Sequence, residues 1–191
     1  MVSQNKIRSL LGPLEALLNF LSSAGVRNLI IGGIAASLLG KPRFTADIDG
    51  LIFLPKGDVE NFLKKAANYG LFPRIKRAAE FAQRSRVVLL KHKGSGVNID
   101  LSLGSLPFEV EALGRGKVFK KGELKFRLPT PEDLIIMKAV AHRPIDMEDI
   151  RCILEVNPSL DFKRIKYWVK EFAKVLEMPE IFDDLKKLLP K

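Results

Sequence analysis

The sequence predicts a mixed α/β fold (α+β), a mixed sheet flanked by helices, over residues 1–128, and an all-helical segment over residues 129–191. As far as Leu128, short apolar runs bounded by glycines and turns alternate with amphipathic helical patterns. Beyond Leu128 only helical periodicity is found. A hydrophobic content of 47% in 191 residues supplies enough apolar material for a core.

The N-terminal elements follow from apolar spacing and from glycines. Apolar residues spaced by three and four predict an amphipathic helix over residues 7–21, which Ala24-Gly25 ends. The apolar run Asn28–Ile31 leads into Gly32-Gly33, and the small, helix-forming residues that follow are closed by Gly40. The order predicted here is strand, glycine turn and short helix.

Further elements are predicted from alternation and from cap signals. Strands are expected over residues 47–54, 81–91 and 97–103, a helix over residues 58–69, and a hairpin over residues 117–128. Thr130 followed by Pro131 is a strong helix start. The C-terminal helices are expected over residues 131–142, 146–155, 161–176 and 179–189.

Composition limits the class of protein. The chain has 32 Lys and Arg against 22 Asp and Glu, a formal charge of +10, and a pI of about 9.8, which favours a polyanionic partner such as nucleic acid, a nucleoside triphosphate or an acidic protein. One Cys and two His exclude a disulfide framework and a Cys/His zinc site. No apolar run is long enough for a membrane span, and no signal peptide is recognised, so we expect a cytoplasmic protein without a membrane partner.

The positive charge is concentrated in two stretches, residues 74–93 and 115–127. If they lie on one side of a cleft, they would attract RNA or another polyanion. The alternative is that basic residues keep exposed strand edges soluble and unpaired. Few aromatic residues interleave these stretches, so the sequence does not indicate a platform for stacking single-stranded bases.

Three aspartates are candidates for a metal site. Asp47 and Asp49 are two apart in a predicted strand, so both project from one face. Paired carboxylates at a strand end suit Mg²⁺ or Mn²⁺, although such a pair is more often a solvated strand end. Asp100 lies on the polar side of a regularly alternating strand and is expected to face water or a metal.

Gly32-Gly33 lies between a predicted strand and a helix. Glycines there let the backbone approach a phosphate at a helix N-terminus, whereas a tight turn with positive φ is the alternative explanation. Neither the Walker A spacing nor G-x-G-x-x-G is present.

These motifs together resemble the polymerase-β-like nucleotidyltransferase superfamily. Ile31-Gly32-Gly33, Asp47-Ile48-Asp49-Gly50 and Ile99-Asp100-Leu101 occur in the order of its motifs. The stretches 130–138 and 141–150 look like the helical segment of its AbiEii-like branch, and the resemblance covers roughly residues 25–155. It implies a nucleotidyltransferase fold and a Mg²⁺-dependent enzyme. Such an enzyme moves a nucleoside monophosphate from a nucleoside triphosphate such as ATP to a hydroxyl on RNA (tRNA included), protein or a small molecule. A toxin–antitoxin role is expected by analogy.

The resemblance also assigns roles to residues. Asp47, Asp49 and Asp100 would be the catalytic residues and would hold two Mg²⁺ (or Mn²⁺) ions, with Asp100 accepting a proton. The residues expected to bind the nucleotide are Gly32, Gly33, Ser37, Arg43, Thr45 and Lys138. Alternatives remain for two of them: Ser37 as a small residue under the turn, and Arg43 as a surface arginine paired with an acid. Lys138 is expected to reach sideways into a cleft.

Three further residues, Arg143, Asp146 and Asp149, are expected to organise a helix–helix turn as an ion-pair and capping cluster. In the superfamily, the position of Gly50 is more usually taken by a bulkier apolar residue, so we expect looser packing of the strand there.

Two other functions are compatible with the sequence. One is a catalytically inert member of the fold that binds a nucleotide or a partner, and the other is a basic RNA-binding module.

Overall fold

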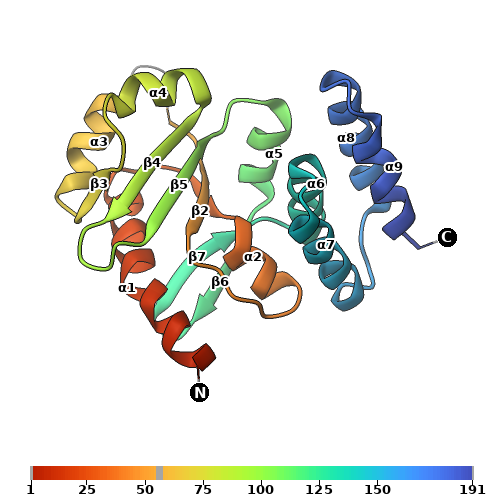
Figure 1. Cartoon of the computed structure of the whole chain (residues 1–191), viewed down its shortest axis with the longest axis horizontal. Coiled ribbons are helices and arrows are strands. Elements are labelled where there is room, and N and C mark those ends of the chain that lie inside the picture. Colours follow the sequence, from red (N-terminus) through yellow and green to blue (C-terminus); the bar gives the residue numbers. More distant parts are fainter. Residues whose placement is uncertain (1, 55–57, 191) are drawn as a thin grey trace. The chain divides into compact units, whose positions relative to one another are not determined.

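The computed structural model describes residues 2–54 and 58–190, with side chains from residue 10 onward in those ranges (Figure 1). Contacts divide the chain into a sheet unit, residues 1–34 and 44–128, and a helical unit, residues 35–43 and 129–191. The helix α2, Gly32–Leu39, begins in the sheet unit and continues into the helical unit. The domain boundary expected between residues 128 and 129 stays a prediction.

The sheet unit contains a five-stranded mixed sheet in the order β1-β2-β5-β4-β3. Its strands are β1 Asn28–Ile30, β2 Ile48–Ile52, β3 Leu71–Pro73, β4 Val87–His92 and β5 Asn98–Leu103. Strands β2 and β5 are parallel, and the other neighbours are antiparallel. A separate antiparallel hairpin consists of β6 Lys117–Lys121 and β7 Leu124–Leu128. The expected α/β class with a mixed sheet is therefore confirmed.

One face of this sheet belongs to the core. Its fully buried side chains are Ile30, Ile48, Ile52, Leu71, Val88, Leu90, Ile99 and Leu101. The helices of the unit are α1 Val2–Ser23, α3 Val59–Ala67, α4 Ala78–Ser85 and α5 Pro107–Arg115. Figure 1 shows α1 running behind the sheet, and Phe20 of α1 meets Phe62 of α3 with ring centroids 4.7 Å apart. Burial of these apolar side chains is the main stabilising contribution in the unit.

On the opposite face, the described apolar side chains are covered near β1 and β2. Leu29 and Leu51 are buried there, and a Cβ on Gly116 would overlap Leu29. Gly116 and the strand β7 of the hairpin therefore lie against β1. Further along the same face, the side chains on β3, β4 and β5 are half-buried or exposed.

The helical unit contains four further helices, α6 Pro131–Ala141, α7 Pro144–Val156, α8 Phe162–Val175 and α9 Pro179–Leu188. Thr130 caps α6 as expected, since its Oγ1 accepts a hydrogen bond of 3.2 Å from the backbone N–H of Asp133. The four helices expected from the sequence are confirmed within about two residues. Within the described residues, no helix has the length and the apolar character required to cross a membrane.

Several expectations were wrong. Residues 78–85 form α4, so the strand expected over residues 81–91 begins only at Val87. The sequence analysis also missed β3 and α5. Packing at Gly50 is tight rather than loose, since a Cβ there would come within 2.8 Å of Leu101 Cδ2.

Candidate functional site

Two of the three candidate aspartates are brought together by strand pairing. In the parallel ladder of β2 and β5, Asp49 is the register partner of Asp100. Register partners project from the same face of a sheet, so both carboxylates lie on the face opposite the core, here called the site face. The Asp49 residue is half-buried, and the Asp100 side chain is 36% exposed, so solvent reaches both strands at this point.

The glycine turn lies against Asp49. Gly32 has a φ of +61°, and a Cβ on it would overlap the Asp49 carboxylate. The backbone N–H of Ile31 also donates a 2.9 Å hydrogen bond to the Asp49 carbonyl. Only glycine allows both the positive φ and this close approach. Because the first four N–H groups of a helix have no intrahelical partner, the start of α2 places hydrogen-bond donors beside an acidic group.

Asp100 has a partner that sequence reasoning missed. Arg74, in the loop after β3, forms an ion pair with Asp100 through Nη2 and Oδ1. The backbone N–H of Arg74 bonds to the Leu89 carbonyl at 3.1 Å, and this contact extends the β3–β4 pairing as far as residue 74. The Nε of Arg74 is buried and has no hydrogen-bond partner among the described residues. The guanidinium group is therefore not fully satisfied by Asp100.

Asp47 and Thr45 lie where the chain enters β2. Asp47 is exposed and directly precedes the strand. Thr45 Oγ1 donates a 3.3 Å hydrogen bond to the backbone carbonyl of Asp47. In the part of the chain that the structure describes, no three His, Cys, Asp or Glu side chains are grouped so that they could hold a metal ion. Mg²⁺ is commonly bound through one or two carboxylates plus substrate phosphates. The oxygen donors of Asp49 and Asp100 fit that chemistry, with Asp47 two residues away.

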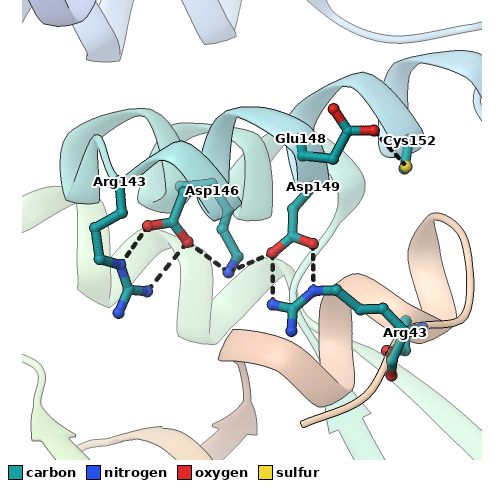
Figure 2. A network of polar contacts seen from close by, with 8 residues as sticks. Arg43, Arg143, Asp146, Glu148, Asp149 and Cys152 are labelled. Atoms are coloured by element: carbon teal, nitrogen blue, oxygen red, sulfur yellow. Dashed lines mark hydrogen bonds and ion pairs between the residues drawn. The ribbon is translucent and has the colours of Figure 1, made fainter.

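The helical unit contains a buried charge network (Figure 2). Lys138 Nζ lies 2.7 Å from Asp146 Oδ1 and 2.8 Å from Asp149 Oδ2, and all three side chains are at most 5% exposed. Arg43 donates to both carboxylate oxygens of Asp149, at 2.5 and 2.7 Å, and Arg143 Nε donates to Asp146 at 2.5 Å. Three cations thus pair with two carboxylates, and this pairing offsets the cost of burying the two carboxylates.

The network shifts the titration of its carboxyl groups. Burial by itself raises the pKa of Asp146, but the hydrogen bonds from Arg143 and Lys138 outweigh burial and hold the pKa below its ordinary value. For Asp149, burial is likewise outweighed by the hydrogen bonds from Arg43 and Lys138, so its pKa is also lowered. Both groups are therefore ionised at neutral pH.

Three residues expected to bind the nucleotide lie in the helical unit. The ammonium group of Lys138 is enclosed by two carboxylates and does not reach sideways into a cleft. Arg43 pairs with an acid, as its alternative interpretation states. Ser37 Oγ donates to the Arg43 carbonyl at 3.0 Å and accepts from its N–H at 3.3 Å, which stabilises the turn after α2. Their nucleotide roles stay predictions, and so does the role of Thr45.

Comparison with known families identifies the chain's relatives. The sequence profile of a family described as "Nucleotidyl transferase of unknown function (DUF2204)" matches residues 11–187. The chain belongs to this family. The resemblance to the polymerase-β-like nucleotidyltransferase superfamily is thereby confirmed. No curated protein matches the chain.

Several solved structures share the fold, and two of them, ANT(2'')-Ia and LnuA, are nucleotidyltransferases. The antibiotic-resistance factor ANT(2'')-Ia superposes with a TM-score of 0.59 at 15% identity, over 87% of this chain and 92% of that one. The lincosamide antibiotic adenylyltransferase LnuA gives 0.52 at 14% identity, over 75% and 95%. JHP933 from Helicobacter pylori gives 0.50 at 16% identity, over 95% and 79%. These likenesses confirm the nucleotidyltransferase fold of the DUF2204 chain.

The close approach of Gly32 to Asp49 makes a testable difference between two glycines. Gly25 has a φ of +64°, nearly that of Gly32, but a Cβ on it would meet nothing within 4 Å. We expect Gly25→Ala to lower the free energy of unfolding by about 1 kcal/mol, the cost of a left-handed alanine. Gly32→Ala should lose at least about 1 kcal/mol more, because the methyl group must displace the Asp49 carboxylate.

Urea unfolding of the two alanine variants measures this difference. Equal losses for Gly25→Ala and Gly32→Ala would contradict the close contact between Gly32 and Asp49.

Removal of the buried lysine should be strongly destabilising. Lys138→Met leaves two buried carboxylates without the cation that they share, and we expect a loss of about 3–5 kcal/mol in the free energy of unfolding. The matched control is Lys186→Met on α9, whose exposed ion pair with Asp183 is worth less than about 1 kcal/mol. Denaturant unfolding of both variants is the measurement, and similar losses would refute the buried network.

The lowered pKa values predict the pH dependence of stability. The stabilisation from Asp146 and Asp149 is complete above the unfolded carboxyl pKa of about 4 and is lost as the pH falls through their lower folded values. Arg143→Gln removes one of the contacts that lower the pKa of Asp146. Unfolding measured from pH 7 to pH 2 should show that the variant is less stable at neutral pH and that its free energy of unfolding falls less steeply as the pH is lowered. An unchanged slope would contradict the assigned cause.

Proposed function

We propose that this chain is a Mg²⁺-dependent nucleotidyltransferase that moves a nucleoside monophosphate from a nucleoside triphosphate to a hydroxyl acceptor. One observation carries the proposal: Asp49 and Asp100 are register partners on one sheet face, and Asp49 lies against the glycine turn that starts α2. Membership of a nucleotidyl transferase family supports the same reaction. Carboxylates beside helix N–H groups suit a triphosphate that carries a divalent ion.

In this proposal the sheet unit supplies the groups that act on the nucleotide. The backbone N–H groups of Gly32 and Gly33 bind oxygens of the terminal phosphates, as the start of a helix does for anions. Asp49 and Asp100, which are register partners, would hold the Mg²⁺ (or Mn²⁺), and Asp47, two residues before Asp49, would join them only once the nucleotide is bound. When bound, the ion neutralises charge on the triphosphate and on the leaving pyrophosphate.

In the proposed transfer step, the acceptor hydroxyl displaces pyrophosphate. The acceptor oxygen forms a bond to the α-phosphorus, and the bond from that phosphorus to the oxygen shared with the β-phosphate breaks. Pyrophosphate leaves, and the hydroxyl proton passes to the Asp100 carboxylate, which acts as a general base. Arg74 positions this carboxylate through their ion pair.

A catalytically inert member of the fold is the second candidate. The ion pair with Arg74 favours it, because Arg74 already neutralises the charge on Asp100. Such a protein would bind a nucleotide or a partner without transferring anything. The ATP preference, the RNA, tRNA or protein acceptor, the toxin–antitoxin role and the cytoplasmic location stay predictions from the sequence.

Transfer activity tests the proposal. The chain is incubated with each α-labelled nucleoside triphosphate, Mg²⁺ and total RNA or cell lysate, and transferred label is measured. We expect transfer by the wild type, its loss when EDTA removes the metal, and a loss of at least about 100-fold in Asp49→Asn, since the variant lacks a charged metal ligand.

Asp183→Asn, which changes an exposed acid on α9, serves as the matched control and should keep wild-type activity. Thermal unfolding confirms that each variant is folded. Transfer that persists in Asp49→Asn would reject the assigned site. Nucleotide binding without transfer to any acceptor, in both proteins, would favour the inert alternative.

A further inference from the structure

Strand pairing brings an aromatic ring and basic side chains onto the site face. Phe72 of β3 pairs with Lys91 of β4, and Lys91 pairs with Asn98 of β5. The adjacent row across the same strands contains Arg74, Leu89 and Asp100. Direct partners in antiparallel strands project from the same face, and residues two apart share a face. Phe72 and Lys91 therefore lie on the face that carries Asp100.

This part of the site face is open to solvent, unlike the core face behind it. Phe72 is 39% exposed, whereas its chain neighbour Leu71 is fully buried. Lys91 is exposed, and exposed Lys93 places its Nζ 5.7 Å from the centroid of the Phe72 ring. An exposed aromatic ring flanked by two lysines is here called the Phe72 platform.

The charge of the platform selects its ligand. Lys91, Lys93 and Arg74 give this region a local excess of positive charge, and among the described residues Arg74 is the one of the three that is paired with an acid, Asp100. A cationic acceptor would be repelled. An acceptor with phosphates and a flat ring suits both the lysines and the exposed ring of the platform, because lysines bind phosphate and exposed aromatic rings stack on bases. Strands β3 and β5 are two strand spacings apart, roughly 10 Å, so one ligand can touch both the platform and Asp100.

We propose that the Phe72 platform binds the acceptor and that this acceptor is the end of a single-stranded RNA. A base stacks on Phe72, backbone phosphates contact Lys91 and Lys93, and the terminal hydroxyl lies toward Asp100. The assignment of an acceptor role rests on the proposed nucleotidyl transfer. The RNA contact itself stands on the platform residues alone.

Equilibrium binding tests the platform separately from the transfer reaction. A short fluorescein-labelled single-stranded RNA of mixed sequence is titrated with the full chain, without nucleoside triphosphate, and anisotropy is followed at several salt concentrations. Lys91→Gln with Lys93→Gln should weaken binding at least about tenfold and should lower the salt slope by about 1.4, since each phosphate contact on a single strand contributes about 0.7. Phe72→Ala should weaken binding about 5- to 100-fold with little change in the salt slope.

Two matched controls carry the same change in charge. Lys64→Gln with Lys65→Gln lies on α3, and Lys120→Gln with Lys125→Gln lies on the β6–β7 hairpin. Each should change binding less than about twofold, and circular dichroism checks that all variants are folded. An equal loss in the hairpin variant would place the RNA elsewhere, and no RNA binding by the wild type would leave a protein or small-molecule acceptor. Either result overturns the proposal.

The transfer assay then separates the two proposals. Retained label transfer to a non-RNA acceptor, with RNA binding unaffected by the platform variants, would refute the platform and leave nucleotidyl transfer intact. RNA binding that depends on Phe72 and Lys91, with no transfer to any acceptor, would support the platform and refute the enzymatic proposal.

Discussion

The parallel pairing of β2 with β5 is the constraint on which the proposed chemistry depends. These strands are separated in sequence by α3, β3, α4 and β4, yet their register places Asp49 directly beside Asp100. A shift of the register by one residue would turn one carboxylate into the core. The core face prevents such a slip, because Ile48, Ile99 and Leu101 are fully buried on it. Apolar packing on one face of the sheet thus fixes the polar geometry on the other.

Charge is handled differently in the two units. In the sheet unit, Asp100 stays partly exposed and has a single cationic partner, Arg74, whose own Nε is unsatisfied within the described residues. In the proposed reaction, this carboxylate would exchange Arg74 for a ligand. In the helical unit, Asp146 and Asp149 are enclosed by Lys138 and two arginines. Breaking that network leaves a buried charge, so it resists rearrangement and ties α6, α7 and the segment before residue 44 together.

The sequence predicted those parts of the fold that have local signals. The strand over residues 97–103 shows regular alternation, and the C-terminal helices show apolar spacing and the Thr130 cap. Strand β3 and the helices α4 and α5, which were missed or misassigned, lack such signals. Strand β3 has only three residues and includes Pro73. Helix α4 is flanked by Arg77 and Arg86 in left-handed conformations, where Gly or Asn would be expected. Helix α5 has no side-chain N-cap, and Glu109 instead accepts hydrogen bonds from the backbone N–H groups of Ser105 and Leu106.

For the site, the motifs identified the aspartates and the glycine turn, while the partners came from tertiary contacts that the sequence does not reveal. Arg74 is 26 residues from Asp100, and Phe72 meets Lys91 through strand pairing and Lys93 across its ring. We propose that Asp49 and Asp100 share a divalent cation. Electron paramagnetic resonance of Mn²⁺, with a non-hydrolysable nucleotide present, tests it most directly. We expect Asp49→Asn and Asp100→Asn each to weaken Mn²⁺ binding at least about tenfold. Wild-type affinity in both variants would contradict it.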